Sequence, residues 1–142
     1  MYHKIIWATD GSAAADAAFP QVQELASANG TSVVVLHCEE AIVGPRSYGV
    51  TINPDEPDIK EKIREQAEDL ESAGVPVTTE FIGGHYGVAA HAIAEAAARD
   101  GADLIVVGTR GHSALGGLML GSVTQRLLHI APCPVLAVPL RD

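Results

Sequence analysis

Cysteine is scarce in this 142-residue sequence, and long apolar runs are missing from its N-terminal end. The two cysteines, Cys38 and Cys133, stand far apart and form no CxxC pair. We therefore expect two reduced, mostly buried thiols and no disulfide or redox site. The apolar run before Asp10 spans only a few residues, which is too short for a signal peptide or a membrane span. These absences predict a cytoplasmic protein.

Basic residues are also few. The chain has 9 lysines and arginines against 18 aspartates and glutamates, a formal net charge of −9, and its basic residues are dispersed. Duplex nucleic acid and anionic membranes are therefore poor partners. The histidines are scattered over different segments, so we expect exposed or core-satisfied imidazoles and no metal site. They are His3, His37, His85, His91, His112 and His129.

Motifs of the common enzyme classes are missing as well. The sequence holds no GxxxxGK(S/T), HExxH or GxSxG motif, and no GxGxxG motif follows the first apolar segment. Because the Walker lysine and its Mg-ligating hydroxyl are absent, fast phosphoryl transfer is not expected. We predict no catalytic residues, and at most a weak ATPase.

Strand and helix patterns alternate along the chain, whose length is typical of one domain, 1–142. Short apolar segments typical of strands occupy 4–9, 31–38, 75–81, 102–108 and 134–139. Helical periodicity marks 14–26, 59–70, 88–100 and 122–130. This alternation predicts a three-layer α/β/α sandwich with a five-stranded, mainly parallel sheet and right-handed crossovers.

Several local features qualify this prediction. Pro20 interrupts the first helical pattern, so we expect a kink there or irregular first turns. The segment 39–57 shows no sustained period and is expected to be a long loop, either a lid over a site or an insertion. Asp58 is a candidate cap for the helix that follows. The segment 75–81 alternates apolar and polar residues, which indicates a strand near a sheet edge.

One stretch, 103–138, carries the strongest functional signal. An apolar strand ends in a loop containing Gly108 and Gly111, where glycine permits positive φ and close approach of a ligand. A helix then begins at Gly121 and Ser122, where free amides and the helix dipole favour a phosphate. The alternative is that the glycines only make a turn after a buried strand. The first interpretation predicts a phosphorylated small molecule as ligand.

The spacing of these residues resembles a known motif. Gly108, Gly111, Gly121 and Ser122 fill every fixed position of GxxGx9G(S/T), the nucleotide motif of the ATP-binding branch of the universal stress protein family. The resemblance extends to IIWATDGS near the start and APCPVLAV near the end, so it covers nearly the whole chain. It implies a Rossmann-like fold with strand order 3-2-1-4-5. In that order a crevice opens beyond the carboxyl ends of the first and fourth strands.

The resemblance also implies which residues contact the nucleoside part of a bound nucleotide. It places Ala8, Thr9 and Asp10 beside the adenine or the ribose, with Cys38 and Val107 touching the base. Asp10 has an alternative role, because an aspartate in a turn often ties the turn together by an Asx hydrogen bond. Both roles stay open at this point.

The phosphate side follows from the glycine loop and the helix start. Backbone amides around Gly108, Arg110, Gly111 and His112 can line a phosphate cradle, and the side chains of Arg110 and His112 can add positive charge. Further cradle residues are Gly121, Ser122, Val123 and Thr124. The hydroxyl of Ser122 can cap the helix or donate to phosphate, and Thr124 supplies a second hydroxyl. Arg126, one turn further, is expected at the surface.

By resemblance the protein is an ATP-binding universal stress protein, a stress-response regulator or nucleotide sensor with little or slow hydrolysis. Its ligand is ATP, ADP or AMP, with or without Mg²⁺. Glu39 and Glu40 can help to hold Mg²⁺, or they only mark a solvated strand end. Alternatives are a slow Mg-dependent ATPase or phosphotransferase using Asp10 or Glu39, and a dimerisation module without nucleotide. The resemblance implies a homodimer through the last strand: Val135, Leu136, Ala137 and Val138.

Overall fold

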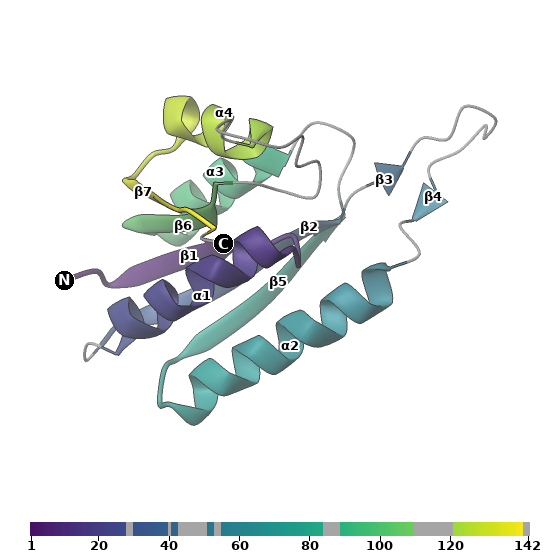
Figure 1. Cartoon of the computed structure of the whole chain (residues 1–142). Coiled ribbons are helices and arrows are strands. Elements are labelled where there is room, and N and C mark those ends of the chain that lie inside the picture. The colour runs from purple at the N-terminus through teal and green to yellow at the C-terminus, as the bar shows by residue number, and fades with distance from the viewer. Residues whose placement is uncertain are drawn as a thin grey trace.

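The computed structural model describes residues 1–27, 30–39, 41–42, 51–52, 55–83, 89–109 and 121–140. Five parallel strands form its main sheet (Figure 1): β1 (Lys4–Ala8), β2 (Ser32–Glu39), β5 (Val77–Gly83), β6 (Leu104–Gly108) and β7 (Val135–Val138). Their spatial order is β5-β2-β1-β6-β7. Counted along the chain this is the order 3-2-1-4-5, so the fold prediction is confirmed, including the edge position of β5.

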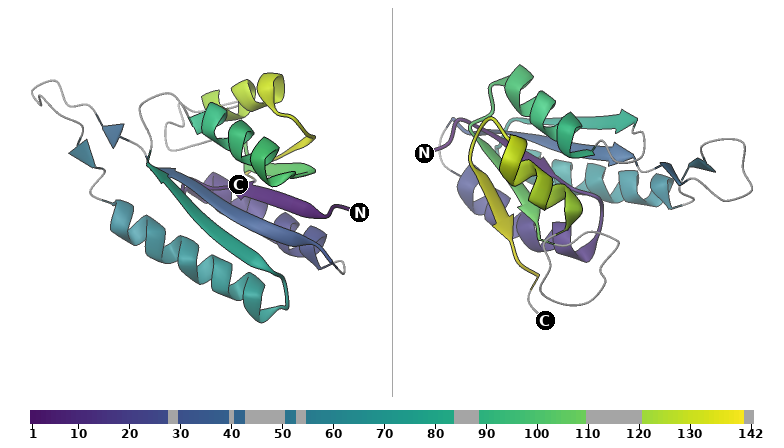
Figure 2. Two further views of the ribbon diagram at one scale, coloured as in Figure 1. Left: turned by 180° about the vertical axis from the view of Figure 1, so that it is seen from behind. Right: turned by 90° about the horizontal axis from the view of Figure 1, so that it is seen from above.

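Two helices cover each face of this sheet, as Figures 1 and 2 show. The helices α1 (Ala13–Ala26) and α2 (Glu56–Ser72) lie on one face, and α3 (Ala89–Asp100) and α4 (Ser122–Ile130) lie on the other. Successive strand residues point to opposite faces, so Trp7 packs under α1 and α2 whereas Ile6 packs under α3 and α4. The sequences of the central strands are continuous apolar runs because both faces of these strands are buried.

Glycines follow the ends of α2 and α3. Gly74 and Gly101 have φ of 88° and 67°, a conformation that L side chains rarely adopt. The amide of Val75 donates to Leu70 O at 3.1 Å after α2, and the amide of Ala102 donates to Ala97 O at 2.9 Å after α3. These are the 6→1 bonds of Schellman motifs, and they turn the chain sharply into the next strand.

The structure bears on three local predictions. α1 continues through Pro20, which lies on its exposed side. It begins with a regular cap in which the Ala15 amide donates to Ser12 Oγ at 3.2 Å, so the irregular first turns considered from the sequence are not found. α2 begins at Glu56, so Asp58 is not its cap, because proline at 57 is compatible with a first helical turn. The predicted loop 39–57 contains β3 (Ala41–Ile42) and β4 (Thr51–Ile52), a short antiparallel pair.

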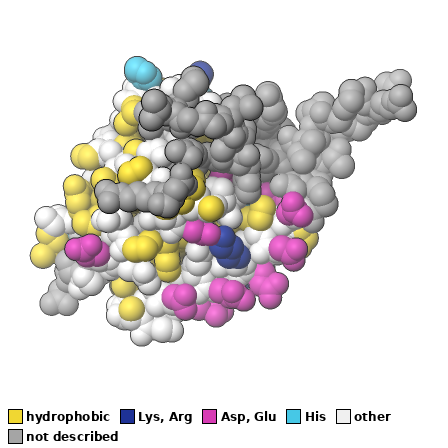
Figure 3. Space-filling model, in the orientation of Figure 1, with side chains coloured by type: hydrophobic (Ala, Val, Ile, Leu, Met, Phe, Trp, Pro, Cys, Tyr) yellow, Lys and Arg dark blue, Asp and Glu magenta, His cyan; other side chains and the backbone are white. Residues whose placement is uncertain are grey.

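Acidic side chains dominate one part of the surface. On the face shown in Figure 3 they gather over α2, whose exposed positions include Glu61, Glu65, Glu68 and Asp69. In the part of the chain that the structure describes, no helix combines the length and the apolar character needed to cross a bilayer.

Candidate functional site at the carboxyl ends of β1 and β6

The predicted site residues converge on one edge of the sheet. Because all five strands are parallel, their carboxyl ends lie together, and β1 pairs directly with both β2 and β6. Asp10 follows the end of β1, Cys38 lies at the end of β2, and Gly108 ends β6. The helices after β1 and β6 cover opposite faces of the sheet, so this edge is the topological switch point where open α/β sheets bind ligands.

Internal hydrogen bonds hold the turn after β1. Asp10 Oδ1 accepts from the Ser12 amide at 2.9 Å, and Thr9 Oγ1 accepts from the Gly11 amide at 3.1 Å. The Thr9 amide continues the ladder by donating to Leu36 O at 2.9 Å. The Asx role considered for Asp10 is therefore confirmed. Thr9 is only 4% exposed, so it shapes the turn from inside.

The structure gives Gly108 a packing role and contradicts one of its two predicted roles, the positive φ. Among the described glycines, positive φ occurs at Gly11, Gly30, Gly74 and Gly101, and Gly108 is not one of them. A Cβ at Gly108 would instead lie 2.5 Å from the carbonyl oxygen of Ala14 in α1. The prediction of positive φ at Gly108 is therefore wrong, because the residue ends a regular strand. Its missing side chain lets the first turn of α1 pack directly on β6.

The end of β6 and the start of α4 are joined by two hydrogen bonds. The Gly121 amide donates to Thr109 O at 2.6 Å, and the hydroxyl of Thr124 donates to Gly108 O at 2.8 Å. Thr124 is 4% exposed, so its hydroxyl helps to hold the start of α4 against the end of β6. The two ends of the glycine motif, Gly108 and Gly121, are thus held close together. Arg110, Gly111 and His112 lie outside the described residues.

The first turn of α4 has the features of an anion-binding helix start. Gly121 is its N-cap residue, so the Ser122 hydroxyl does not cap the helix as considered from the sequence, and no described side chain caps it. The turn holds no acidic residue, whereas α1 and α2 carry acids in their first turns. Ser122 and Val123 are exposed, and the amides of a first helical turn have no partner within the helix. Arg126 is exposed, as predicted.

The base side of the predicted site is apolar. Burial, and then the nearby charge of Glu80, raise the pKa of the Cys38 thiol to about 11. The thiol is therefore protonated at neutral pH and is a weak nucleophile. Burial, and then Asp103, also raise the pKa of Cys133, and both cysteines are free. Val107 is buried with 4% exposure, and Ala8 is half-buried.

The groups considered for a metal ion have other surroundings. Glu39, at the end of β2, forms an ion pair with Lys60 of α2, and Glu40 lies outside the described residues. Within the residues that the structure describes, no cluster of three histidine, cysteine, aspartate or glutamate side chains is placed to hold a metal ion.

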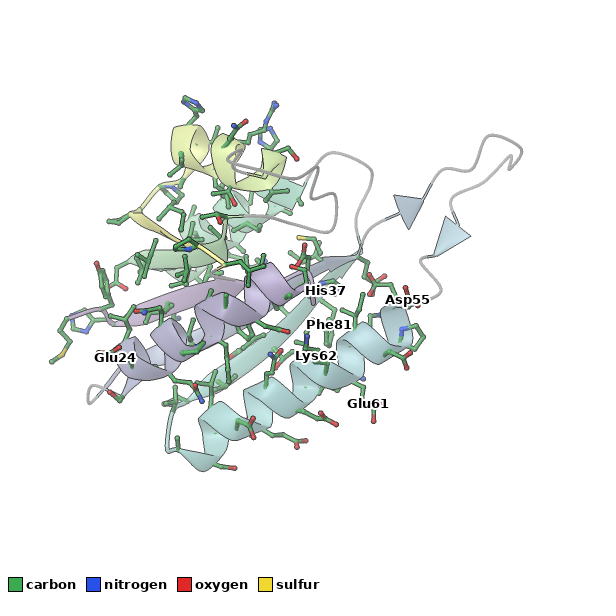
Figure 4. All side chains as sticks on the ribbon, in the orientation of Figure 1. Glu24, His37, Asp55, Glu61, Lys62 and Phe81 are labelled. Carbon is green, nitrogen blue, oxygen red and sulfur yellow. The ribbon has the colours of Figure 1, made fainter. Side chains whose placement is uncertain are left out.

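Sequence reasoning missed a buried pair beside the site. His37, labelled in Figure 4, is 2% exposed near the end of β2. It reaches Thr9 O through Nδ1 at 2.9 Å and the Glu56 carboxylate through Nε2 at 2.9 Å. The prediction of a core-satisfied imidazole is confirmed for His37. Glu56 was assigned to a loop, so no pattern marked it as buried. A histidine within a continuous apolar strand was the one available signal that a polar partner had to exist.

Comparison with known proteins agrees with this geometry. Residues 1–139 match the universal stress protein family. A universal stress protein of Thermus aquaticus is 36% identical over 146 residues, which cover 97% of this chain and 99% of that protein. The solved structure of MJ0577, a universal stress protein of Methanocaldococcus jannaschii, superposes with a TM-score of 0.80 at 25% identity, covering 100% of this chain and 99% of that one.

Two further solved structures carry adenine nucleotides. A universal stress protein in complex with cAMP has a TM-score of 0.68 at 23% identity, covering 99% of this chain and 98% of its own. A family protein of Arabidopsis thaliana with AMP bound has a TM-score of 0.68 at 19% identity, covering 98% and 92%. At these identities the two likenesses establish a shared fold.

Proposed function

Because the chain belongs to the universal stress protein family, we propose that it binds an adenine nucleotide, with ATP as the expected ligand, at the carboxyl ends of β1 and β6. The observation that carries this proposal is the junction between Gly108 and α4. The Thr124 hydroxyl donates to Gly108 O at 2.8 Å, which holds beside the end of β6 a helix start that no described side chain caps. Helix starts of this kind are favourable sites for phosphate groups.

The proposed ligand lies across the switch point with its two ends in different surroundings. Ala8, Asp10 and Cys38 surround the nucleoside, where a protonated thiol and small side chains favour an apolar base. The phosphates occupy the first turn of α4 at Ser122 and Val123, with Arg110, Gly111 and His112 contributed by the glycine loop. The chain lacks a Walker lysine, so it acts as a nucleotide-responsive regulator with little or slow hydrolysis.

A charge placed in the first turn of α4 should abolish nucleotide binding without harming the fold. In Ser122→Asp the new carboxylate occupies the phosphate position and repels the ligand, while it interacts favourably with the helix dipole by about 0.3–1 kcal/mol. We expect at least about a tenfold loss of ATP affinity, equivalent to about 1.4 kcal/mol, in isothermal titration calorimetry. The melting temperature without nucleotide should stay the same or rise.

Ser72→Asp provides the matched control. It changes the net charge equally, but at the exposed last residue of α2, at the opposite end of a helix. Its ATP affinity should equal that of the wild-type protein. The proposal fails if millimolar ATP, ADP and AMP leave the wild-type melting temperature unchanged, which would favour a dimerisation module. It also fails if Ser122→Asp binds ATP normally.

We also propose a homodimer formed through β7. This strand is the last of the sheet order, and its Leu136 is 36% exposed. An edge strand with an exposed apolar side chain favours pairing with a second copy. Leu136→Lys should therefore yield monomers in sedimentation velocity, whereas Thr78→Lys, on the opposite edge strand β5, should not. Identical sedimentation of the wild-type protein and Leu136→Lys would contradict this dimer.

A further inference from the structure

One side of α2 contacts the turn that follows β1. Glu56, Ile59 and Lys62 are spaced by three residues, so they follow one another along the helix surface. Glu56 reaches the turn through His37, Ile59 packs against Gly11, and Lys62 bonds to Gly11. The turn contains Asp10, the one carboxylate of the proposed nucleoside side. Figure 4 shows Lys62 between α2 and α1, and His37 near the start of α2.

The first contact is a buried chain of hydrogen bonds. The carbonyl of Thr9 only accepts, so His37 Nδ1 must carry the hydrogen in their 2.9 Å contact. Nε2 then faces both oxygens of Glu56, at 3.1 and 2.9 Å, and a second hydrogen must lie between these groups. His37 and Glu56 are 2% and 3% exposed, so water does not replace either bond. Glu56 thereby fixes the Thr9 carbonyl from a distance.

The contacts of Lys62 and Ile59 hold Gly11, the residue after Asp10. Lys62 Nζ donates to Gly11 O at 3.1 Å and pairs with the Asp16 carboxylate of α1. Gly11 has φ of 78°, and a Cβ there would lie 2.8 Å from Ile59 Cγ2. Ile59 therefore packs directly on the backbone of the turn. The carbonyls before and after Asp10 are both held, directly or through His37, by side chains of α2.

We propose that Glu56, His37 and Lys62 are positioning residues for the nucleotide site, and that α2 sets the orientation of Asp10 toward the nucleoside. This inference rests on the proposed function. A displacement of the first two turns of α2 is therefore transmitted to Asp10 through these three side chains. The affinity for ATP is then controlled from outside the residues that touch it.

The decisive comparison is between two neighbouring lysines. Lys62→Met removes the bond to Gly11 O, whereas Lys60→Met removes an ion pair with Glu39 and makes the same change of charge. We expect Lys62→Met to shift the backbone amide NMR signals of residues 9–12 and to weaken ATP binding about tenfold, since an ångström-scale displacement is enough for such an effect. Lys60→Met should leave the amide signals of residues 9–12 in place. Its ATP affinity should stay within about twofold of that of the wild-type protein, a difference of about 0.4 kcal/mol.

A conservative pair of variants separates positioning from folding. Glu56→Gln keeps a hydrogen-bond partner for His37 Nε2, because its amide nitrogen donates and its oxygen accepts. It should retain ATP affinity within about threefold, while Glu56→Ala should lose about tenfold or more. ATP affinities of Lys62→Met and Glu56→Ala that equal that of Lys60→Met would overturn the positioning role alone. A wild-type protein that binds no ATP would refute the proposed function, and the positioning role with it. If Glu56→Ala does not fold, Lys62→Met, which changes a partly exposed side chain, decides the question.

Discussion

Gly108→Ala should lower the free energy of unfolding by about 1–3 kcal/mol, the usual cost of forcing extra atoms into a packed site. Its new Cβ would lie 2.5 Å from the oxygen and 2.7 Å from the carbon of the Ala14 carbonyl. Both atoms belong to the backbone of α1, so no side-chain rotation relieves the contact. The first turn of α1 must move away from β6. Urea unfolding followed by Trp7 fluorescence measures the loss.

The same substitution should also weaken ATP binding, because Gly108 O receives the Thr124 hydroxyl that fixes the start of α4. Gly83→Ala is the matched control, since Gly83 also ends a strand and a Cβ there meets no atom of the described residues within 4 Å. Its stability should change by no more than about 0.5 kcal/mol. Equal stabilities for the two variants would show that α1 does not pack against Gly108 in solution.

Trp7→Ala should produce the largest loss of stability, about 3–5 kcal/mol, as is typical when a buried tryptophan is truncated. Trp7 is fully buried in the central strand and stacks on Phe19 of α1 with ring centroids 5.0 Å apart. Folded domains are stable by only about 5–15 kcal/mol, so this variant should be partly unfolded or melt far below the wild-type protein. Far-ultraviolet circular dichroism is the appropriate measurement, because Trp7 is the only tryptophan.

Trp7→Phe is the informative companion variant. It keeps an aromatic ring against Phe19 and removes the indole Nε1, which is buried and has no hydrogen-bond partner among the described residues. An unpaired buried donor costs about 1–3 kcal/mol, and its removal offsets part of the lost packing. We expect Trp7→Phe to lose less than half as much stability as Trp7→Ala. A loss equal to that of Trp7→Ala would show that the indole is paired in solution.

The fold could be predicted because its signals are local. A central strand such as β2 is buried on both faces and therefore reads as a continuous apolar run, and the glycines after α2 and α3 mark the helix ends. The strand order is not local, and it came from the family resemblance. β3 and β4 were missed because strands of two residues leave no periodicity to detect.

The sequence predicted which segments lie together at the candidate site, but not the contacts that hold them there. The motif correctly indicated that Gly108 and the start of α4 lie close together, and the turn at Asp10 was identified. The contact between Gly108 and Ala14 was not predictable, because it depends on how α1 lies across β6. The pair of His37 and Glu56 was missed for the same reason, since it joins two elements through tertiary structure alone.

The connecting segments differ in length between the two ends of the sheet, here called its amino-terminal and carboxyl rims. At the amino-terminal rim the linkers are short, with only 73–76 between α2 and β5 and only 101–103 between α3 and β6. At the opposite rim β2 and α2 are separated by 40–55, and β6 and α4 by 109–121. The fold should therefore tolerate peptide insertions and deletions at the carboxyl rim better than at the other, although changes within 109–121 would alter the glycine spacing of the proposed site. Descendants of this chain can acquire new binding behaviour by changing loop length there, while the strand register stays intact.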